Sequence, residues 1–262
     1  MIKAAFFDID GTLLSFNTHR VSEGTVRAFD LLHRCGVRTF LSTGRPKVLI
    51  PPMPVDFEGG IMMNGALVRC EGEVLRRNPI PQADSEAWID FAKRHSLSTM
   101  IFTEEGMFAS QVNDVARRLR DQLEFLMPDE VPIDDLREHE AYQIIALMPV
   151  ALDAEVGHLM PHCRLPRWHP AFSDIVCDGN SKAVGMDAVC RYLGISQSET
   201  LAFGDGANDI EMLQWAGIGV AMGNADDNVK AHADRVTTSV DDEGIEQAVR
   251  LLLANGEIAI NN

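Results

Sequence analysis

The sequence lacks any apolar run near the roughly 18 residues that a membrane-spanning helix requires. Its first ten residues hold a short apolar stretch that Asp8 and Asp10 end, whereas a secretory signal needs a longer stretch and a small-residue cleavage site. The five cysteines are scattered and form no C-x-x-C pair, which fits reduced thiols rather than a disulfide framework. We therefore expect a soluble, cytoplasmic protein with no membrane partner.

Positive charge is also scarce. Against 39 aspartates and glutamates there are 23 lysines and arginines, so the formal net charge of the 262 residues is −16. A protein that holds nucleic acid through phosphate contacts needs a basic surface, so we expect no nucleic-acid partner. The 46% of hydrophobic residues is ordinary for a globular chain, and the length allows one large domain or two modest ones.

Both ends of the chain alternate apolar stretches with helical patterns. Strand, helix and strand follow one another within the first 45 residues, and a similar rhythm returns after residue 180. This order is typical of a parallel sheet. We expect strands at residues 2–7, 37–42, 60–63, 200–203 and 218–221, and helices at residues 22–35, 181–193 and 243–254.

Between these two parts, helix-like and strand-like stretches are mixed in another way. The sequence therefore predicts an α/β fold, with a Rossmann-like parallel-sheet core interrupted by an inserted α+β domain. We place the first part of the core at residues 1–82, the insert at 83–178 and the second part of the core at 179–262.

Polar residues follow three of the expected core strands. Ligands bind beyond the carboxyl ends of the strands in open parallel sheets. Several carboxylates at one rim repel each other unless a cation lies among them, and oxygen ligands favour Mg²⁺. A backbone N–H in a loop, a threonine and a lysine at a helix start suit an anion. The residues concerned are Asp8, Asp10, Thr43, Gly44, Lys182, Asp205, Asn208 and Asp209.

These residues stand in a recognisable order. The segments D-I-D-G-T (8–12), S-T-G-R (42–45) and G-D-G-A-N-D (204–209), with Lys182 between the last two, resemble the four motifs of the haloacid dehalogenase superfamily. The presence of an insert after the third strand resembles the Cof-type branch, which has a C2B cap. The segments M-N-G-A (63–66) and R-W-H-P-A-F-S-D (167–174) resemble bacterial hexose-phosphate phosphatases. The resemblance implies a phosphatase that hydrolyses small phosphomonoesters such as sugar phosphates, with Mg²⁺ and through an aspartyl-phosphate intermediate.

The resemblance also implies a role for each residue. Asp8 is the expected nucleophile, and Asp10 is the expected acid and base. The carboxylates of Asp8 and Asp205 and the carbonyl of Asp10 would hold Mg²⁺, and Asp209 would support the site. The transferring phosphoryl group would be bound by Thr43, Gly44, Lys182 and Asn208.

Four further residues are candidates for contact with a small phosphorylated metabolite. Arg45 follows the expected phosphate loop, and Asn64 precedes a glycine, as a turn residue also would. Arg167 and Trp168 lie in the insert, which we expect to select the substrate, although a tryptophan there also suits simple packing. The core motifs alone provide little that could recognise a leaving group.

Other functions on the same scaffold stay open. A phosphomutase or phosphotransferase would use the same nucleophile, and a non-catalytic sugar-phosphate sensor would keep the same pocket. A phosphoryl-accepting signalling module would need only about half of this length and no insert. The physiological substrate and the oligomeric state are not predicted.

Overall fold

The computed structural model describes residues 1–123, 128, 130–167 and 169–260. Its contacts divide the chain into two compact units. The core unit comprises residues 1–45, 51–77 and 181–262, and the inserted unit comprises residues 46–50 and 78–180. The longer segment of the inserted unit thus runs from residue 78 to residue 180, whereas the expected bounds were 83 and 178. The reason is local, since Ile80 packs in the apolar cluster of that unit and Asn78 bonds to Asn180.

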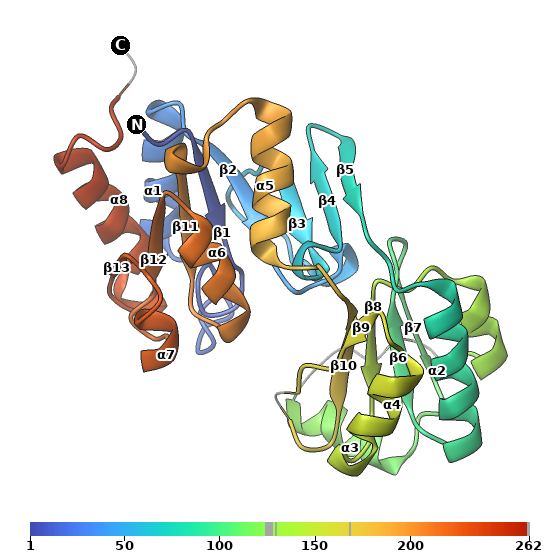
Figure 1. Cartoon of the computed structure of the whole chain (residues 1–262). Helices are drawn as coiled ribbons and strands as arrows, with labels where there is room; N and C mark the ends of the chain where they lie inside the picture. Colours follow the sequence, from blue (N-terminus) through green and yellow to red (C-terminus); the bar gives the residue numbers. More distant parts are fainter. Residues whose placement is uncertain (124–127, 129, 168, 261–262) are drawn as a thin grey trace. The chain divides into compact units, whose positions relative to one another are not determined.

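The core unit has one sheet flanked by helices, drawn in blue to cyan and in orange to red in Figure 1. Its strands are β1 (Ala4–Phe7), β2 (Arg38–Ser42), β3 (Gly59–Met62), β4 (Leu67–Cys70), β5 (Glu73–Arg77), β11 (Thr200–Gly204), β12 (Ile218–Ala221) and β13 (Arg235–Val236). Its helices are α1 (Glu23–Arg34), α5 (Lys182–Leu193), α6 (Ile210–Trp215), α7 (Asp227–Lys230) and α8 (Gly244–Ala254).

The strands of this sheet follow the order β13-β12-β11-β1-β2-β3-β4-β5. All pairings from β13 to β3 are parallel, and β4 and β5 add antiparallel strands at one edge. The parallel α/β core was therefore predicted correctly. The β4–β5 hairpin was not predicted, because its tight turn at Glu71 and Gly72 carries little sequence signal beyond one glycine.

Successive side chains of β1 point to opposite faces of the sheet, as the strand period requires. Phe6 stacks on Phe40 within the apolar cluster that α5 and α6 cover. Phe7 contacts the ring of Phe29 on α1, with which α8 packs. Both faces are therefore buried, which explains why β1 reads as a continuous apolar run.

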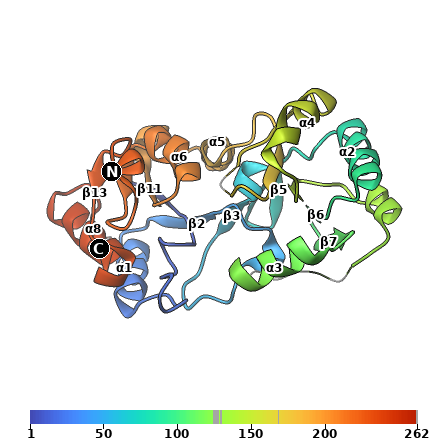
Figure 2. The same cartoon turned by 90° about the horizontal axis from the view of Figure 1, so that it is seen from below.

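The inserted unit has a five-stranded antiparallel sheet of order β7-β6-β8-β10-β9. Its helices lie beside this sheet, and Figure 2 shows the same elements from below. The strands are β6 (Thr99–Phe102), β7 (Met107–Ser110), β8 (Gln143–Ala146), β9 (Cys163–Arg164) and β10 (Ser173–Cys177). The helices are α2 (Gln82–His95), α3 (Asp114–Leu123) and α4 (Asp153–Leu159).

Two apolar clusters hold this unit together. Trp88 and Phe91 of α2 pack with Ile101, Ile144 and Ile175 of the central strands. A smaller cluster joins α3 to residues near the ends of β8 and β10. The mixed α+β character expected for the insert is therefore present. Among the described residues, the structure has no helix with the length and apolar character needed to cross a membrane.

Candidate active site

The carboxyl ends of β11, β1 and β2 lie side by side, because these strands are neighbours in register. Phe7 pairs with Phe203 on one side and with Leu41 on the other. The chain therefore leaves the sheet at Asp8, Asp205 and Thr43 along the same edge. This brings together residues that are as much as 197 positions apart in the sequence.

Lys182 is the most buried cation of this edge. It is the first residue of α5, whose N-cap Ser181 accepts a hydrogen bond from the backbone of Val184. Its side chain has no exposed surface, and its ammonium group lies 2.5 Å from a carboxylate oxygen of Asp8 and also bonds to Asp209. Burial opposes the positive charge, but Asp209 and Asp8 raise the pKa of Lys182 above its ordinary value.

Asp209 organises the loop that follows β11. Its Oδ2 accepts hydrogen bonds from the backbone N–H groups of Asp205 and Gly206, at 3.0 and 2.9 Å, while Oδ1 faces Lys182. A Cβ atom at position 204 would lie 2.5 Å from the Asp209 side chain, so this close approach requires glycine. The G-D-G-x-N-D pattern thus has a local structural cause.

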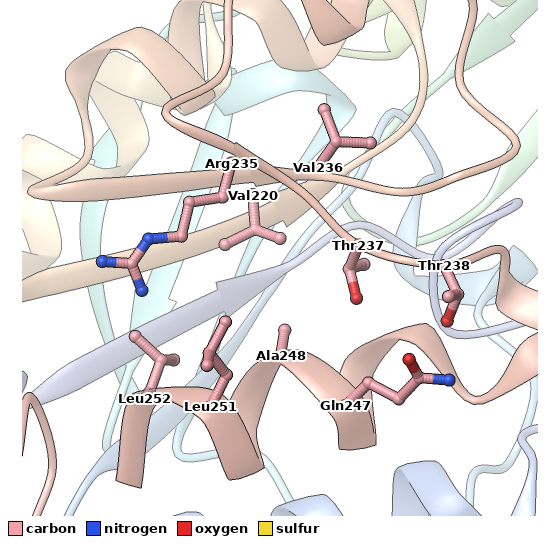
Figure 3. A pocket seen from close by; sticks show the side chains of 9 residues that line it. All are labelled: Val220, Arg235, Val236, Thr237, Thr238, Gln247, Ala248, Leu251 and Leu252. Carbon is pink, nitrogen blue, oxygen red and sulfur yellow. The ribbon is translucent and has the colours of Figure 1, made fainter. Parts of the chain in front are cut away.

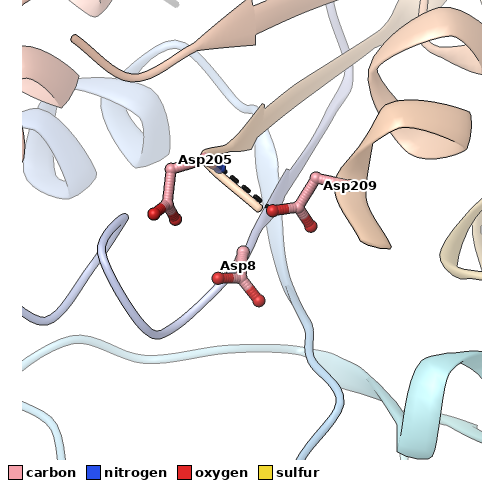
Figure 4. Close-up of side chains that lie close together, drawn as sticks. All are labelled: Asp8, Asp205 and Asp209. Atoms are coloured by element: carbon pink, nitrogen blue, oxygen red, sulfur yellow. Dashed lines mark hydrogen bonds between the residues drawn. The ribbon is translucent and has the colours of Figure 1, made fainter. Parts of the chain in front are cut away.

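Asp8, Asp205 and Asp209 form an acidic triad that could hold a metal ion. Each offers one oxygen, and these oxygens lie within 4.8 Å of one another. Figure 4 shows the three carboxylates converging from the end of β1, the end of β11 and the turn that follows. With Lys182 counted, three negative charges and one positive charge leave a net −2, which suits a divalent cation.

The electrostatics of the triad point the same way. Burial is the largest influence that raises the pKa of Asp8, followed by the neighbouring Asp209, while Lys182 opposes the shift. Burial also raises the pKa of Asp205 to about 6, although a hydrogen bond from Thr12 lowers it. Further positive charge beside these two carboxylates would therefore favour their ionised forms.

Asp205 is held by two neutral donors. The Thr12 hydroxyl donates to Oδ1 at 2.8 Å, and the Asn224 amide donates to Oδ2 at 3.2 Å. Asn224 was not predicted as a functional residue. Its position directly after a glycine that follows β12 is the only signal that could have drawn attention to it.

Asp10 and Arg45 form an ion pair through two hydrogen bonds. The Arg45 Nε donates to one carboxylate oxygen at 2.8 Å, and Nη2 donates to the other at 2.6 Å. Both side chains are partly exposed, at 40% for Asp10 and 33% for Arg45. The arginine expected to contact substrate thus binds the residue expected to act as acid and base.

The expected phosphate-binding residues gather around a turn with a strained backbone. Met63 and Asn64 both have positive φ, at 48° and 53°, which is uncommon for residues other than glycine. The turn brings the Asn64 amide beside Gly44, where a Cβ atom would lie 3.2 Å from it. The Asn208 side-chain amide donates to Oδ1 of Asn64 at 3.0 Å. The buried Thr43 hydroxyl accepts from the backbone N–H of Arg45.

Arg167 and Trp168 are the candidates for substrate contact in the inserted unit. Arg167 is 14% exposed and forms an ion pair with Asp153. Its Nη1 also donates to the carbonyl oxygens of Met148, His169 and Pro170, at 3.2 to 3.3 Å. The guanidinium group is therefore committed to its own unit. Trp168 lies outside the described residues.

A separate cavity of about 450 Å³ lies at the far edge of the core sheet. Figure 3 shows its lining, which includes Val236 of β13 and Gln247 and Leu251 of α8. None of the expected site residues lines it. This cavity is therefore separate from the candidate active site, which lies at the polar strand ends elsewhere on the sheet.

Comparisons with known proteins agree with this geometry. The family model of haloacid dehalogenase-like hydrolases matches residues 5–249. YkrA of Bacillus subtilis is 33% identical over 95% of this chain and 97% of its own length. The pyridoxal phosphate phosphatase YbhA of Escherichia coli is 28% identical, over 92% of this chain and 95% of its own.

A solved structure extends the similarity to three dimensions. It is that of a sugar phosphatase of subclass IIB of the superfamily, with 36% identity and a TM-score of 0.82. The match covers 95% of this chain and 98% of that one. Sequence and fold thus agree with these proteins over nearly the whole length, and the chain belongs to the haloacid dehalogenase-like hydrolases, as a member of their phosphatase branch.

Proposed function

We propose that this enzyme is a Mg²⁺-dependent phosphatase that hydrolyses small sugar phosphates through an aspartyl-phosphate intermediate. The observation that carries the proposal is the arrangement at the end of β1. There, Asp8 lies 2.5 Å from a fully buried lysine, beside two further carboxylates. The similarity to a sugar phosphatase supports the substrate class.

The donor set fits a hard divalent cation. Three carboxylates offer oxygens within 4.8 Å of one another, and their excess charge over Lys182 is two units. Asp8 and Asp205, with the backbone carbonyl of Asp10, are the ligands that we propose, and Asp209 supports the loop and the lysine. When bound, Mg²⁺ would neutralise charge that the phosphoryl oxygens share with Asp8.

The residues of the chain account for the remaining chemistry. An oxygen of Asp8 attacks the phosphorus, and the bond between the phosphorus and the sugar oxygen breaks. Asp10 donates a proton to that oxygen, so that the sugar leaves as an alcohol. Asp10 then takes a proton from water, which attacks the phosphorus and releases Asp8 and inorganic phosphate.

The surrounding groups hold the phosphoryl group during both steps. Thr43, the N–H of Gly44, Lys182 and Asn208 are the donors that we propose for its oxygens. In the structure, Arg45 occupies both carboxylate oxygens of Asp10. Each of these oxygens keeps a second lone pair, so Asp10 can exchange a proton while Arg45 orients its carboxylate.

Phosphate release over a panel of hexose phosphates, pyridoxal phosphate and nucleotides tests the proposal. We expect sugar phosphates to give the highest kcat/KM, activity to vanish after exhaustive chelation, and added Mg²⁺ to restore it. Full activity without a divalent cation would contradict the metal requirement. A clear preference for pyridoxal phosphate or nucleotides would contradict the substrate class.

A trapping experiment tests the intermediate. Rapid acid quenching of the enzyme with a ³²P-labelled hexose phosphate should leave label on Asp8, and Asp8→Asn should leave none. Labelling of the Asp8→Asn protein would show that another residue is the nucleophile.

A further inference from the structure

Asn224 lies in the loop between β12 and α7 and uses both ends of its side chain. Its amide nitrogen donates to the carbonyl oxygen of Gly11 at 2.8 Å and to Oδ2 of Asp205 at 3.2 Å. Its amide oxygen accepts from the backbone N–H of Val240 at 2.9 Å. An exposed asparagine that makes three such bonds to distant segments is more than a solvated loop residue.

The orientation of this amide follows from its partners. A backbone N–H can only donate, and a backbone carbonyl can only accept. Val240 therefore requires the Asn224 oxygen on its side, and Gly11 requires the nitrogen on the other. The amide nitrogen therefore also faces Asp205, to which it can only donate.

Asp205 receives one donor on each oxygen. Thr12 holds Oδ1 at 2.8 Å, and Asn224 holds Oδ2. Both donors are neutral, so they fix the carboxylate without cancelling the negative charge that a cation needs. Gly11 adds a steric limit, because a Cβ atom at that position would lie 2.1 Å from Oδ2 of Asp205.

We propose that Asn224 is a positioning residue that orients the Asp205 carboxylate for the divalent cation. This inference rests on the proposed metal dependence. Partners that orient metal ligands through hydrogen bonds are typically worth 10- to 100-fold in metal affinity. The competing explanation is that Asn224 only ties the loop around Gly11 to the turn that begins at Val240.

Asn17 provides a matched control, because it joins the same two regions without touching Asp205. Its amide donates to Asp241 at 2.7 Å. Asn17→Ala removes this tie, whereas Asn224→Ala and Asn224→Ser remove the contact to Asp205 as well. Both of the positions changed are exposed, and the melting temperature of each metal-free variant reports whether it folds.

The test is isothermal titration of the metal-free full-length protein with MgCl₂, with activity measured against Mg²⁺ concentration. For Asn224→Ala and Asn224→Ser we expect the Kd for Mg²⁺ to rise about 10- to 100-fold. At saturating Mg²⁺, kcat should return to within a few-fold of the unmodified enzyme. Asn17→Ala should leave the Kd unchanged.

Two results would overturn the inference. One is an unchanged Kd in both Asn224 variants, and the other is an equal rise in Asn17→Ala, which would assign the effect to the tie between loops. Failure of the proposed function looks different, because the unmodified protein would then bind no Mg²⁺ and would stay active after chelation.

Discussion

Lys182 in the core unit and Arg167 in the inserted unit are both cations that we expected to contact the phosphorylated substrate. Lys182 is fully buried, and among the described residues it forms ion pairs with the carboxylates of Asp8 and Asp209, which belong to the expected site. Arg167 is bound by Asp153 and by three backbone carbonyls of its own unit. Lys182 thus lies among residues of the proposed site, whereas Arg167 is held by groups of its own unit.

The difference lies in where each residue stands relative to a sheet. Lys182 begins a helix beside the carboxyl ends of parallel strands, where several chain segments converge by construction. Arg167 lies between β9 and β10 of an antiparallel sheet, and its partners belong to the same unit. We therefore propose ligand contact for Lys182, which lies at a parallel strand end, and a structural role for Arg167.

The largest expected effect concerns the two carboxylates of β1. Asp8→Asn should lower kcat by about 10⁴-fold or more, because it removes the proposed nucleophile. Asp10→Asn should cost about 10² to 10⁴, the usual contribution of an acid/base group. Steady-state phosphate release measures both, and circular dichroism checks that each variant is folded. Equal losses in the two variants would argue against separate roles.

We expect a smaller loss of activity when Arg45 is changed. The informative result is how the loss of kcat/KM differs between substrates. If Arg45 positions Asp10, Arg45→Ala should lower kcat/KM roughly 10- to 100-fold on a hexose phosphate. p-Nitrophenyl phosphate should be affected less, because its leaving group needs little protonation. Arg45→Lys keeps the charge but not the paired hydrogen bonds. An equal loss on both substrates would instead indicate that Arg45 binds the phosphoryl group.

Arg167→Ala should act on stability rather than on substrate choice. Removing the guanidinium leaves the Asp153 carboxylate and three carbonyls without this donor, a loss of about 1–3 kcal/mol. Thermal unfolding should show it, and kcat/KM should change by the same factor for every sugar phosphate. Arg117→Ala is the control, since its ion pair with Asp114 is exposed. Unequal changes among substrates would restore Arg167 as a specificity residue.

The smallest effect concerns Glu246, which joins α8 to α1. Hydrogen bonds from Arg27 and Arg250 lower the pKa of Glu246 to about 2. Because the folded pKa lies below the ordinary value of 4.5, this contribution is present above about pH 4.5 and is lost as the pH falls toward 2.

Glu246→Gln should therefore destabilise the protein near neutral pH by less than about 1 kcal/mol, because both arginines are largely exposed. The difference from the unmodified protein should shrink below pH 4 in urea unfolding. Glu23→Gln, at a site 97% exposed, serves as the reference. A difference that persists at pH 2 would assign the effect to packing.

Much of the core could be predicted from the sequence. The apolar runs before Asp8 and Thr43 and before Asp205 marked three buried strands, because a strand covered on both faces must be apolar throughout. The α/β class, the inserted α+β domain and the family followed from these runs and their motifs. The β4–β5 hairpin was missed, since two short strands at an edge carry weak periodicity.

By itself, then, the sequence determined which residues we propose to carry the chemistry, since side-chain type and the strand-to-loop pattern are local properties. Only the tertiary structure decided the partners: Arg45 on Asp10, Arg167 on Asp153, and Asn224 on Asp205. Asn224 reaches Gly11 from 213 positions away, and no local pattern encodes that contact. Such pairs form because the packed sheet brings distant loops to one edge, where each buried or half-buried polar group must find a partner.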